Sequence, residues 1–128
     1  MIKKEVSFFG KMEKPTAQAC IQGPCGDSME FFLKIVRNTV RQVRCFTSGC
    51  GASKACAAET ARMAQGKSLA KALLISPGRV IQALKNVPED HLHCAILSVS
   101  TLHRAIALYL MSGKRKIRLL AKDLPRER

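Results

Sequence analysis

Three of the six cysteines stand in sequence contexts that favour reactive or metal-ligating sulfur. Cys25 lies between Gly-Pro and Gly, Cys50 lies between two glycines, and Cys94 directly follows His93. Glycine permits unusual backbone angles and lets the backbone approach a bound group closely. Cys50 also directly precedes a predicted helix, whose positive N-terminal dipole favours the thiolate. These three cysteines are therefore our candidates for metal or sulfur chemistry.

The other three cysteines have the surroundings of small apolar residues. Cys20 and Cys45 fall within predicted strands, and Cys56 falls within an alanine-rich predicted helix. Buried cysteine usually behaves as a small hydrophobe. We therefore expect Cys20, Cys45 and Cys56 to be packed in the core.

The spacing of the cysteines and histidines is not that of a zinc finger. The chain contains no C-x₂-C pair and no H-x₃₋₅-H pair. His91 and His93 are two residues apart and cannot both face one metal on a regular helix, and we interpret His103, in mid-helix, as a packed or exposed histidine. The spacing allows three loop-end cysteines to meet at one end of a small domain, but it does not require this.

Asp27 follows Cys25 by two residues, with Gly26 between them. If Gly26 turns the loop, both side chains can point the same way. A carboxylate oxygen is a harder ligand than a thiolate and a poorer match for iron–sulfur iron, so such a site would hold a cluster without keeping it. Alternatively, Asp27 caps the loop through backbone amides. The residues alone leave both interpretations open.

The predicted strands come before the predicted helices in the sequence, and these elements must position the candidate residues. Alternating and β-branched segments predict strands, and alanine-rich or apolar segments with a three- and four-residue period predict helices. The predicted strands cover residues 17–22, 30–37 and 40–47, and the predicted helices cover 52–65, 69–74, 77–85 and about 88–112. This order predicts an α+β fold, in which a small antiparallel three-stranded sheet is followed by helices packed on one face.

Capping residues and an apolar stripe support the predicted helices. Gly66 occupies a C-terminal cap position, Ser68 and Ser76 can cap the N-termini of the next two helices, and Pro77 suits a first helical position. Along the last helix, one apolar face is predicted to be buried. Its members are Leu92, Ala95, Ile96, Val99, Leu102, Ile106 and Tyr109.

Length and composition indicate one ordinary globular domain. The chain has 128 residues, of which 47% are hydrophobic and 24% are charged. We expect a loosely ordered segment over residues 1–16, a folded scaffold domain over 17–113 and a basic tail over 114–128. We see no run of about 18 apolar residues, so we expect no membrane span. The default location is cytoplasmic, where thiols stay reduced.

The net charge of +13 predicts an acidic partner, since opposite charges speed encounter. A solvated basic surface without a dedicated partner is the alternative. Nucleic acid is disfavoured, because only 5% of the residues are aromatic and no nucleic-acid-binding motif is present.

Three motifs occur in an order that resembles the IscU/NifU family of iron–sulfur cluster assembly scaffolds. They are Gly23-Pro24-Cys25-Gly26-Asp27, Ser48-Gly49-Cys50-Gly51 and His93-Cys94. The similarity includes Gly66-Lys67-Ser68-Leu69 and extends over roughly residues 17 to 111. The resemblance implies an IscU/SufE-like fold, which agrees with the order of elements.

The resemblance also implies a function and a set of ligands. Cys25, Asp27, Cys50 and Cys94 would hold a transient [2Fe–2S] cluster, with His93 as an additional or alternative ligand. Asp27 would keep the cluster labile, and Cys94 would accept persulfide sulfur from a cysteine desulfurase. Apo iron–sulfur proteins would receive the cluster, and iron or zinc would bind at the same site. Such a scaffold is not an enzyme.

The chain departs from the family in the segment that leads into His93. The IscU branch carries Leu-Pro-Pro-Val-Lys there, as a docking segment for a dedicated Hsp70 chaperone, whereas this chain reads Val87-Pro88-Glu89-Asp90-His91. This difference argues against such a chaperone. We expect a stand-alone, divergent member. The alternative function is a persulfide relay that needs a reactive Cys94 but neither Asp27 nor a cluster.

Overall fold

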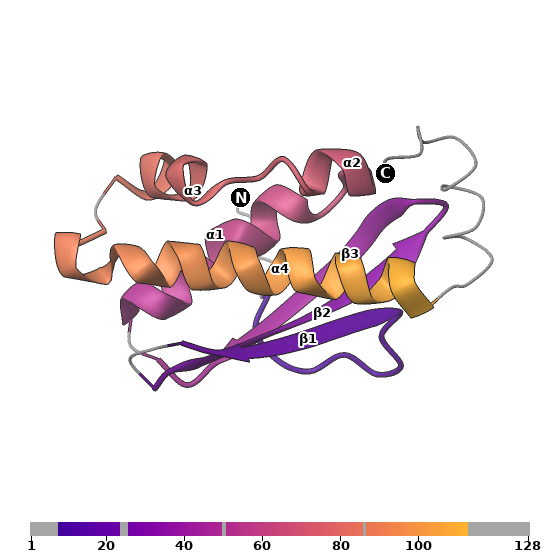
Figure 1. Cartoon of the computed structure of the whole chain (residues 1–128), viewed down its shortest axis with the longest axis horizontal. Helices are drawn as coiled ribbons and strands as arrows, with labels where there is room; N and C mark the ends of the chain where they lie inside the picture. Colours follow the sequence, from indigo (N-terminus) through magenta and orange to yellow (C-terminus); the bar gives the residue numbers. More distant parts are fainter. Residues whose placement is uncertain (1–7, 24–25, 50, 86, 113–128) are drawn as a thin grey trace, which may run out of the picture.

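The computed structural model describes residues 8–23, 26–49, 51–85 and 87–112 (Figure 1). Two of the predicted ligands, Cys25 and Cys50, lie outside these residues, as does the predicted basic tail over 114–128. Asp27, His93 and Cys94 are described, so the structure can test how these three residues are placed.

A three-stranded antiparallel sheet opens the fold, as the sequence predicts. The strands are β1 (Ala17–Gln22), β2 (Ser28–Val36) and β3 (Thr39–Thr47), in the order β1-β2-β3. A two-residue turn joins β2 to β3, and both of its residues, Arg37 and Asn38, have positive φ values of 53° and 61°. Such a turn matches the twist of a hairpin. β2 begins two residues earlier than the sequence predicts, because Ser28 and Met29 also pair with neighbouring strands.

Helices follow the sheet along the described chain. They are α1 (Gly51–Ala64), α2 (Leu69–Ala72), α3 (Pro77–Leu84), the 3₁₀ turn η1 (Glu89–His91) and α4 (Leu92–Ser112). The predicted caps are confirmed: the Ser68 and Ser76 hydroxyls each accept a hydrogen bond from a backbone N–H three residues later, both at 3.2 Å. Gly66 has a φ of +89°, which glycine adopts without strain.

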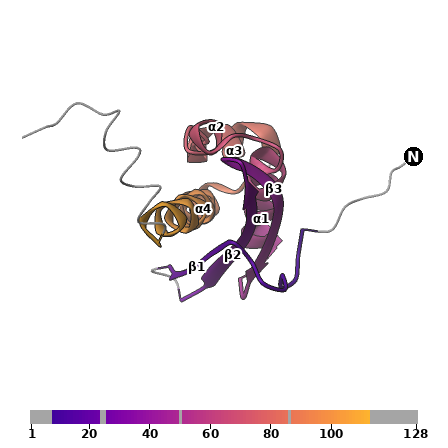
Figure 2. The ribbon, with the colours of Figure 1, turned by 90° about the vertical axis from the view of Figure 1, so that its right-hand side faces the viewer.

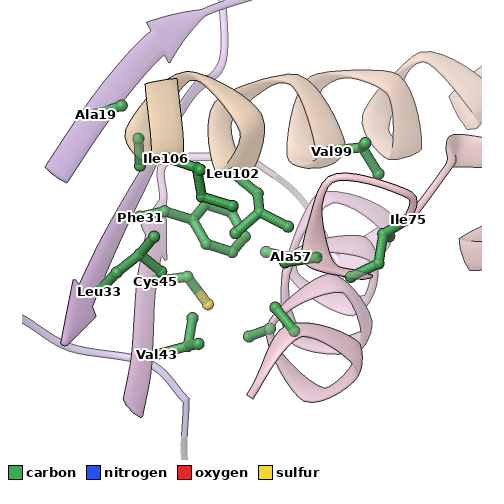
Figure 3. Packing of buried hydrophobic residues seen from close by; sticks show 14 of the residues in the cluster. Ala19, Phe31, Leu33, Val43, Cys45, Ala57, Ile75, Val99, Leu102 and Ile106 are labelled. Carbon is green, nitrogen blue, oxygen red and sulfur yellow. The ribbon is translucent and has the colours of Figure 1, made fainter. Parts of the chain in front are cut away.

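The helices cover one face of the sheet, so the predicted α+β architecture is confirmed. α4 packs along β1 and β2, and α1 packs on β3 and beside α4 (Figures 1 and 2). The core between these layers is apolar (Figure 3). Its fully buried members include Phe31, Leu33, Val43, Ala57 and Leu102. Burial of this apolar surface is the main stabilising term.

The buried face of α4 is wider than the predicted stripe. The prediction is wrong for Ile96, which is 54% exposed. α4 contacts α1 and α3 as well as the sheet, so its buried surface extends to a second side. Buried positions beyond the predicted stripe include Leu97, Ser98, Thr101 and Ala105, and Ser98 Oγ lies 4.0 Å from Met29 Sδ in the sheet.

The segment Glu89–Ser112 is long and apolar enough to cross a membrane by length and composition alone, which the sequence analysis did not expect. Of the most apolar part of this segment, 56% is buried inside the fold. The core helix of a globular domain has the same composition, so packing against the sheet explains the hydropathy of α4.

Residues 8–16 are more ordered than the predicted loose segment over 1–16. Gly10 N donates to Cys45 O at 3.0 Å, and Cys45 N donates to Phe8 O at 2.6 Å, so this part pairs with the free edge of β3. Thr16 N then donates to Leu33 O at 2.8 Å. The segment therefore crosses from the β3 edge to β1, as Figure 2 shows.

The buried cysteines are only partly as predicted. Cys45 and Cys56 are fully buried in the core, but Cys20 is exposed, so that prediction is wrong. β1 alternates, with Ala17 and Ala19 facing the helices, and this places Cys20 on the opposite face of the strand. The helices cover only one face, which leaves the sulfur of Cys20 accessible.

We predict that Phe31→Ala lowers the free energy of unfolding by about 3–5 kcal/mol, because it leaves a cavity in a fully buried position. The matched control is Phe46→Ala, because Phe46 is 47% exposed, and it should cost less than about 1 kcal/mol. Urea denaturation measures both. Equal losses would contradict the placement of the core.

A second prediction concerns pH, since burial raises the pKa of the Cys45 thiol from 9.0 to about 12. Above pH 9 the unfolded chain releases this proton and the folded chain keeps it, so stability falls as pH rises through this range. The thiol contributes a slope of up to about 1.4 kcal/mol per pH unit. Urea denaturation between pH 8 and about 10.5 should show a shallower decline for Cys45→Ala. Cys20→Ala, at an exposed position, should keep the wild-type decline.

Candidate functional site

One end of the domain brings together three segments that are far apart in the sequence. They are the β1–β2 loop, the start of α1 and the start of α4, which all lie at the left in Figure 1. Asp27 closes the β1–β2 loop, Ser53 lies in the first turn of α1, and Cys94 lies in the first turn of α4. The candidate site is built from these three residues and His93.

Ser53 is the residue that joins the other two. Its Oγ lies 3.3 Å from Asp27 Oδ2 and 3.2 Å from Cys94 Sγ. Ser53 is fully buried and Cys94 is 1% exposed. A polar group in such a place must be hydrogen-bonded, and this pair of contacts satisfies the hydroxyl.

The hydroxyl of Ser53 carries one proton, so its two contacts are coupled. When Ser53 donates to Asp27, the Cys94 thiol can donate to Ser53 Oγ. When Ser53 instead donates to the sulfur, the contact with Asp27 loses its proton. The buried Ser53 side chain therefore links the hydrogen bonding of the Cys94 sulfur to that of the Asp27 carboxylate.

The positive ends of two helix dipoles point toward the site. α1 begins at Gly51 and α4 begins at Leu92. The N-terminal turn of a helix favours negative charge nearby, which here means the carboxylate of Asp27 or a thiolate at Cys94. Both helix starts therefore suit a site that handles anionic sulfur.

His93 lies next to the sulfur and against a second histidine. Its Nε2 is 3.9 Å from Cys94 Sγ, and its ring stacks on that of His91, with the ring centres 6.1 Å apart. On one regular helix, two residues two positions apart could not both face one metal. His91 belongs to η1 instead, where the backbone path differs, and its Nδ1 is 3.0 Å from Asp90 Oδ1.

The structure bears on the two interpretations of Asp27. The β1–β2 loop is closed by its backbone, because Gly23 N donates to the carbonyl oxygen of Asp27 at 2.7 Å. The side chain of Asp27 accepts from Ser53 instead. The carboxylate therefore shares the Ser53 hydroxyl with Cys94 Sγ.

Gly49 is required by the close approach of the chain to this cluster. A Cβ atom at Gly49 would lie 2.6 Å from Asp27 Oδ2 and closer still to Ser53 Oγ. Such a contact is impossible without displacing one of the two groups. This close approach is to side chains of the protein itself, while the predicted approach of the backbone to a bound group stays a prediction.

Ser53 is the residue that sequence reasoning missed. It stands three positions after Cys50 in a helix of small residues, and nothing in its local sequence marks it. His103, which the sequence left as packed or exposed, is half-buried. Its Nε2 lies 3.2 Å from the carbonyl oxygen of Ala72, on a different part of α4.

Within the described ranges, no three His, Cys, Asp or Glu side chains lie close enough together to hold a metal ion. Asp27, His93 and Cys94 gather at one end of the domain, and Cys25 and Cys50 lie outside the described residues. The assignment of all five as ligands therefore stays a prediction.

Comparison with known proteins identifies the family of the chain. The family described as the NifU-like N-terminal domain matches residues 7–116, which is most of the sequence. The chain belongs to this family. This is the family that the resemblance in the sequence implied.

Two curated relatives match the chain at moderate identity. An iron–sulfur cluster assembly scaffold protein of Archaeoglobus fulgidus is 34% identical over 101 residues, which cover 78% of this chain and 66% of that protein. The corresponding protein of Aquifex aeolicus is 34% identical over 98 residues, which cover 75% and 62%. The chain therefore spans slightly less than two thirds of the length of these relatives.

A solved structure shares the fold. The N-terminal part of a NifU-like protein from Brucella abortus superposes with a TM-score of 0.65 and 16% sequence identity, covering 85% of this chain and 88% of that one. At this identity the likeness concerns the NifU-like fold alone.

We predict that Gly49→Ala lowers the free energy of unfolding by about 1–3 kcal/mol, because the new Cβ displaces Ser53 or Asp27. Gly51→Ala is the matched control two residues away, since a Cβ there meets nothing within 4 Å. It should be neutral or stabilising by up to about 1 kcal/mol. Thermal or urea denaturation checks both. A harmless Gly49→Ala would contradict the close packing around Ser53.

Proposed function

We propose that this protein is an iron–sulfur cluster assembly scaffold. It accepts sulfur and iron, holds a transient [2Fe–2S] cluster and passes it to apo-proteins. The observation that carries the proposal is the convergence of Asp27, Ser53 and Cys94 at one end of a NifU-like domain. The curated relatives named as cluster assembly scaffolds support it.

Sulfur enters through Cys94 in this proposal. The Cys94 thiolate attacks the outer sulfur of a persulfide on a cysteine desulfurase, a new S–S bond forms, and the desulfurase thiolate leaves. Two electrons from an external donor then reduce the persulfide to sulfide. Cys94 is 1% exposed, so its sulfur must become accessible before a partner can reach it.

The cluster is cargo, and its ligands are Cys25, Cys50 and Cys94 with Asp27. The thiolates suit iron, while the harder carboxylate binds it less well and lets the cluster leave. His93, 3.9 Å from Cys94 Sγ, is placed to serve as an alternative ligand. The same set of sulfur, nitrogen and oxygen donors also suits zinc. A scaffold of this kind forms and releases its cargo and is not a turnover catalyst.

We predict that anaerobic reconstitution with iron, cysteine and a desulfurase gives the visible absorption of a [2Fe–2S] centre. Cys25→Ala, Cys50→Ala and Cys94→Ala should each abolish it, because each removes a thiolate ligand. Cys20→Ala is the control, since Cys20 is exposed on the sheet and outside the site. Wild-type protein without a chromophore, but with a persulfide on Cys94 by mass spectrometry, would instead indicate a sulfur relay.

We further predict that Asp27→Ala forms the same chromophore but releases it more slowly. Removing the weak oxygen ligand leaves the three thiolates and frees a position for a stronger donor. Transfer to an apo-ferredoxin-type acceptor, followed by absorption, measures the rate. Unchanged or faster transfer would remove Asp27 from the proposed mechanism.

A further inference from the structure

A groove lies on the helical side of the domain, away from the cysteine site. It has a volume of about 330 Å³ and is formed where the C-terminal end of α1 meets α2 and the start of α3. The helix rise puts this end of α1 roughly 15 Å from Ser53 along the axis. The residues that line the groove are Met63, Lys67, Lys71, Leu74, Ile75 and Arg79.

The groove is lined by three apolar residues, Met63, Leu74 and Ile75, here called its floor, and by three cations, Lys67, Lys71 and Arg79, here called its rim. Half of its lining residues are aliphatic or thioether side chains, and the other half are cations, with no acidic residue among them. Leu74 is 74% exposed, the largest exposed fraction among the large hydrophobic residues of the described chain. Leu74 therefore presents apolar surface to solvent directly beside the three cations of the groove.

The three cations lack carboxylate partners within the described chain. The ion pairs found there are Arg62 with Glu59 and His91 with Asp90, and both involve other residues. Lys67 Nζ donates to the carbonyl oxygen of Met63 at 3.2 Å, which leaves further ammonium protons for another acceptor. The rim is therefore available to an anionic ligand.

Lys67 belongs to the motif Gly66-Lys67-Ser68-Leu69, which the cluster site does not use. The fold explains its other three members: Gly66 has a positive φ, Ser68 caps α2, and Leu69 is buried. The backbone of Lys67 also pairs with β3, because Val40 N donates to its carbonyl oxygen at 2.8 Å. Its side chain, however, points into the groove lining and is exposed.

We propose that this groove binds an acidic segment of a partner protein that carries a large aliphatic side chain. The aliphatic side chain covers Leu74 and Ile75, and the flanking carboxylates meet Lys67, Lys71 and Arg79. Nucleic acid fits less well, because no aromatic residue lines the groove to stack on a base. The proposal does not depend on the cluster chemistry, and the distance from Ser53 lets both sites be occupied together.

The test uses the full-length ¹⁵N-labelled protein and the peptide acetyl-Asp-Glu-Leu-Leu-Glu-Asp-amide. Titration should shift the backbone amide signals of the groove residues. The double variant Lys71→Glu/Arg79→Glu should weaken binding about tenfold or more, because two attractions become repulsions. The control Arg41→Glu/Arg104→Glu makes the same change in net charge at exposed positions outside the groove, and should weaken binding less than about threefold.

Leu74→Ser tests the apolar half, since its exposure makes the variant harmless to folding. The variant should lower the affinity for the leucine peptide severalfold. A peptide with serine in place of both leucines binds more weakly, and its affinity should not change. If the two charge variants weakened peptide binding equally, the effect would come from the net charge of the protein and not from the groove, and this would overturn the proposal. Shifts elsewhere, or tighter binding of a deoxythymidine hexamer in this groove, would also overturn it.

Discussion

The packing of α4 along β1 and β2 is the constraint on which the rest of the structure depends. This contact buries the largest helix against the sheet and thereby fixes where its first turn lies. Cys94 sits in that first turn, so the core of the protein and the position of its sulfur are set together. α1 packs on β3 and beside α4, which brings Ser53 to the same end.

The cluster at the end of the domain consists of only three side chains, those of Asp27, Ser53 and Cys94. One buried hydroxyl lies within hydrogen-bond reach of a carboxylate and a sulfur from opposite parts of the chain. Glycine at position 49 leaves room for this contact, and two helix N-termini supply favourable potential. The described part of the site is therefore polar and small, which fits the proposed scaffold role.

The groove accounts for part of the net charge of +13. Part of it lies on the rim of the groove between α1, α2 and α3, beside an exposed leucine and without acidic neighbours in the lining. The proposed scaffold would exchange sulfur and cluster with partners, and a docking surface remote from Cys94 would hold a partner without covering the sulfur. Charge would speed the encounter, and the apolar floor would select the segment.

The sequence by itself determined the order of elements, the helix caps and the residues around each cysteine motif, because these depend on local periodicity and backbone preference. Only the tertiary structure decided which side chains meet. Ser53 carries no local signal, Cys20 is exposed because one face of the sheet lacks helices, and Ile96 is exposed although it fits the apolar period of α4. Such contacts join residues far apart in the chain, and packing geometry, which no local pattern encodes, selects them.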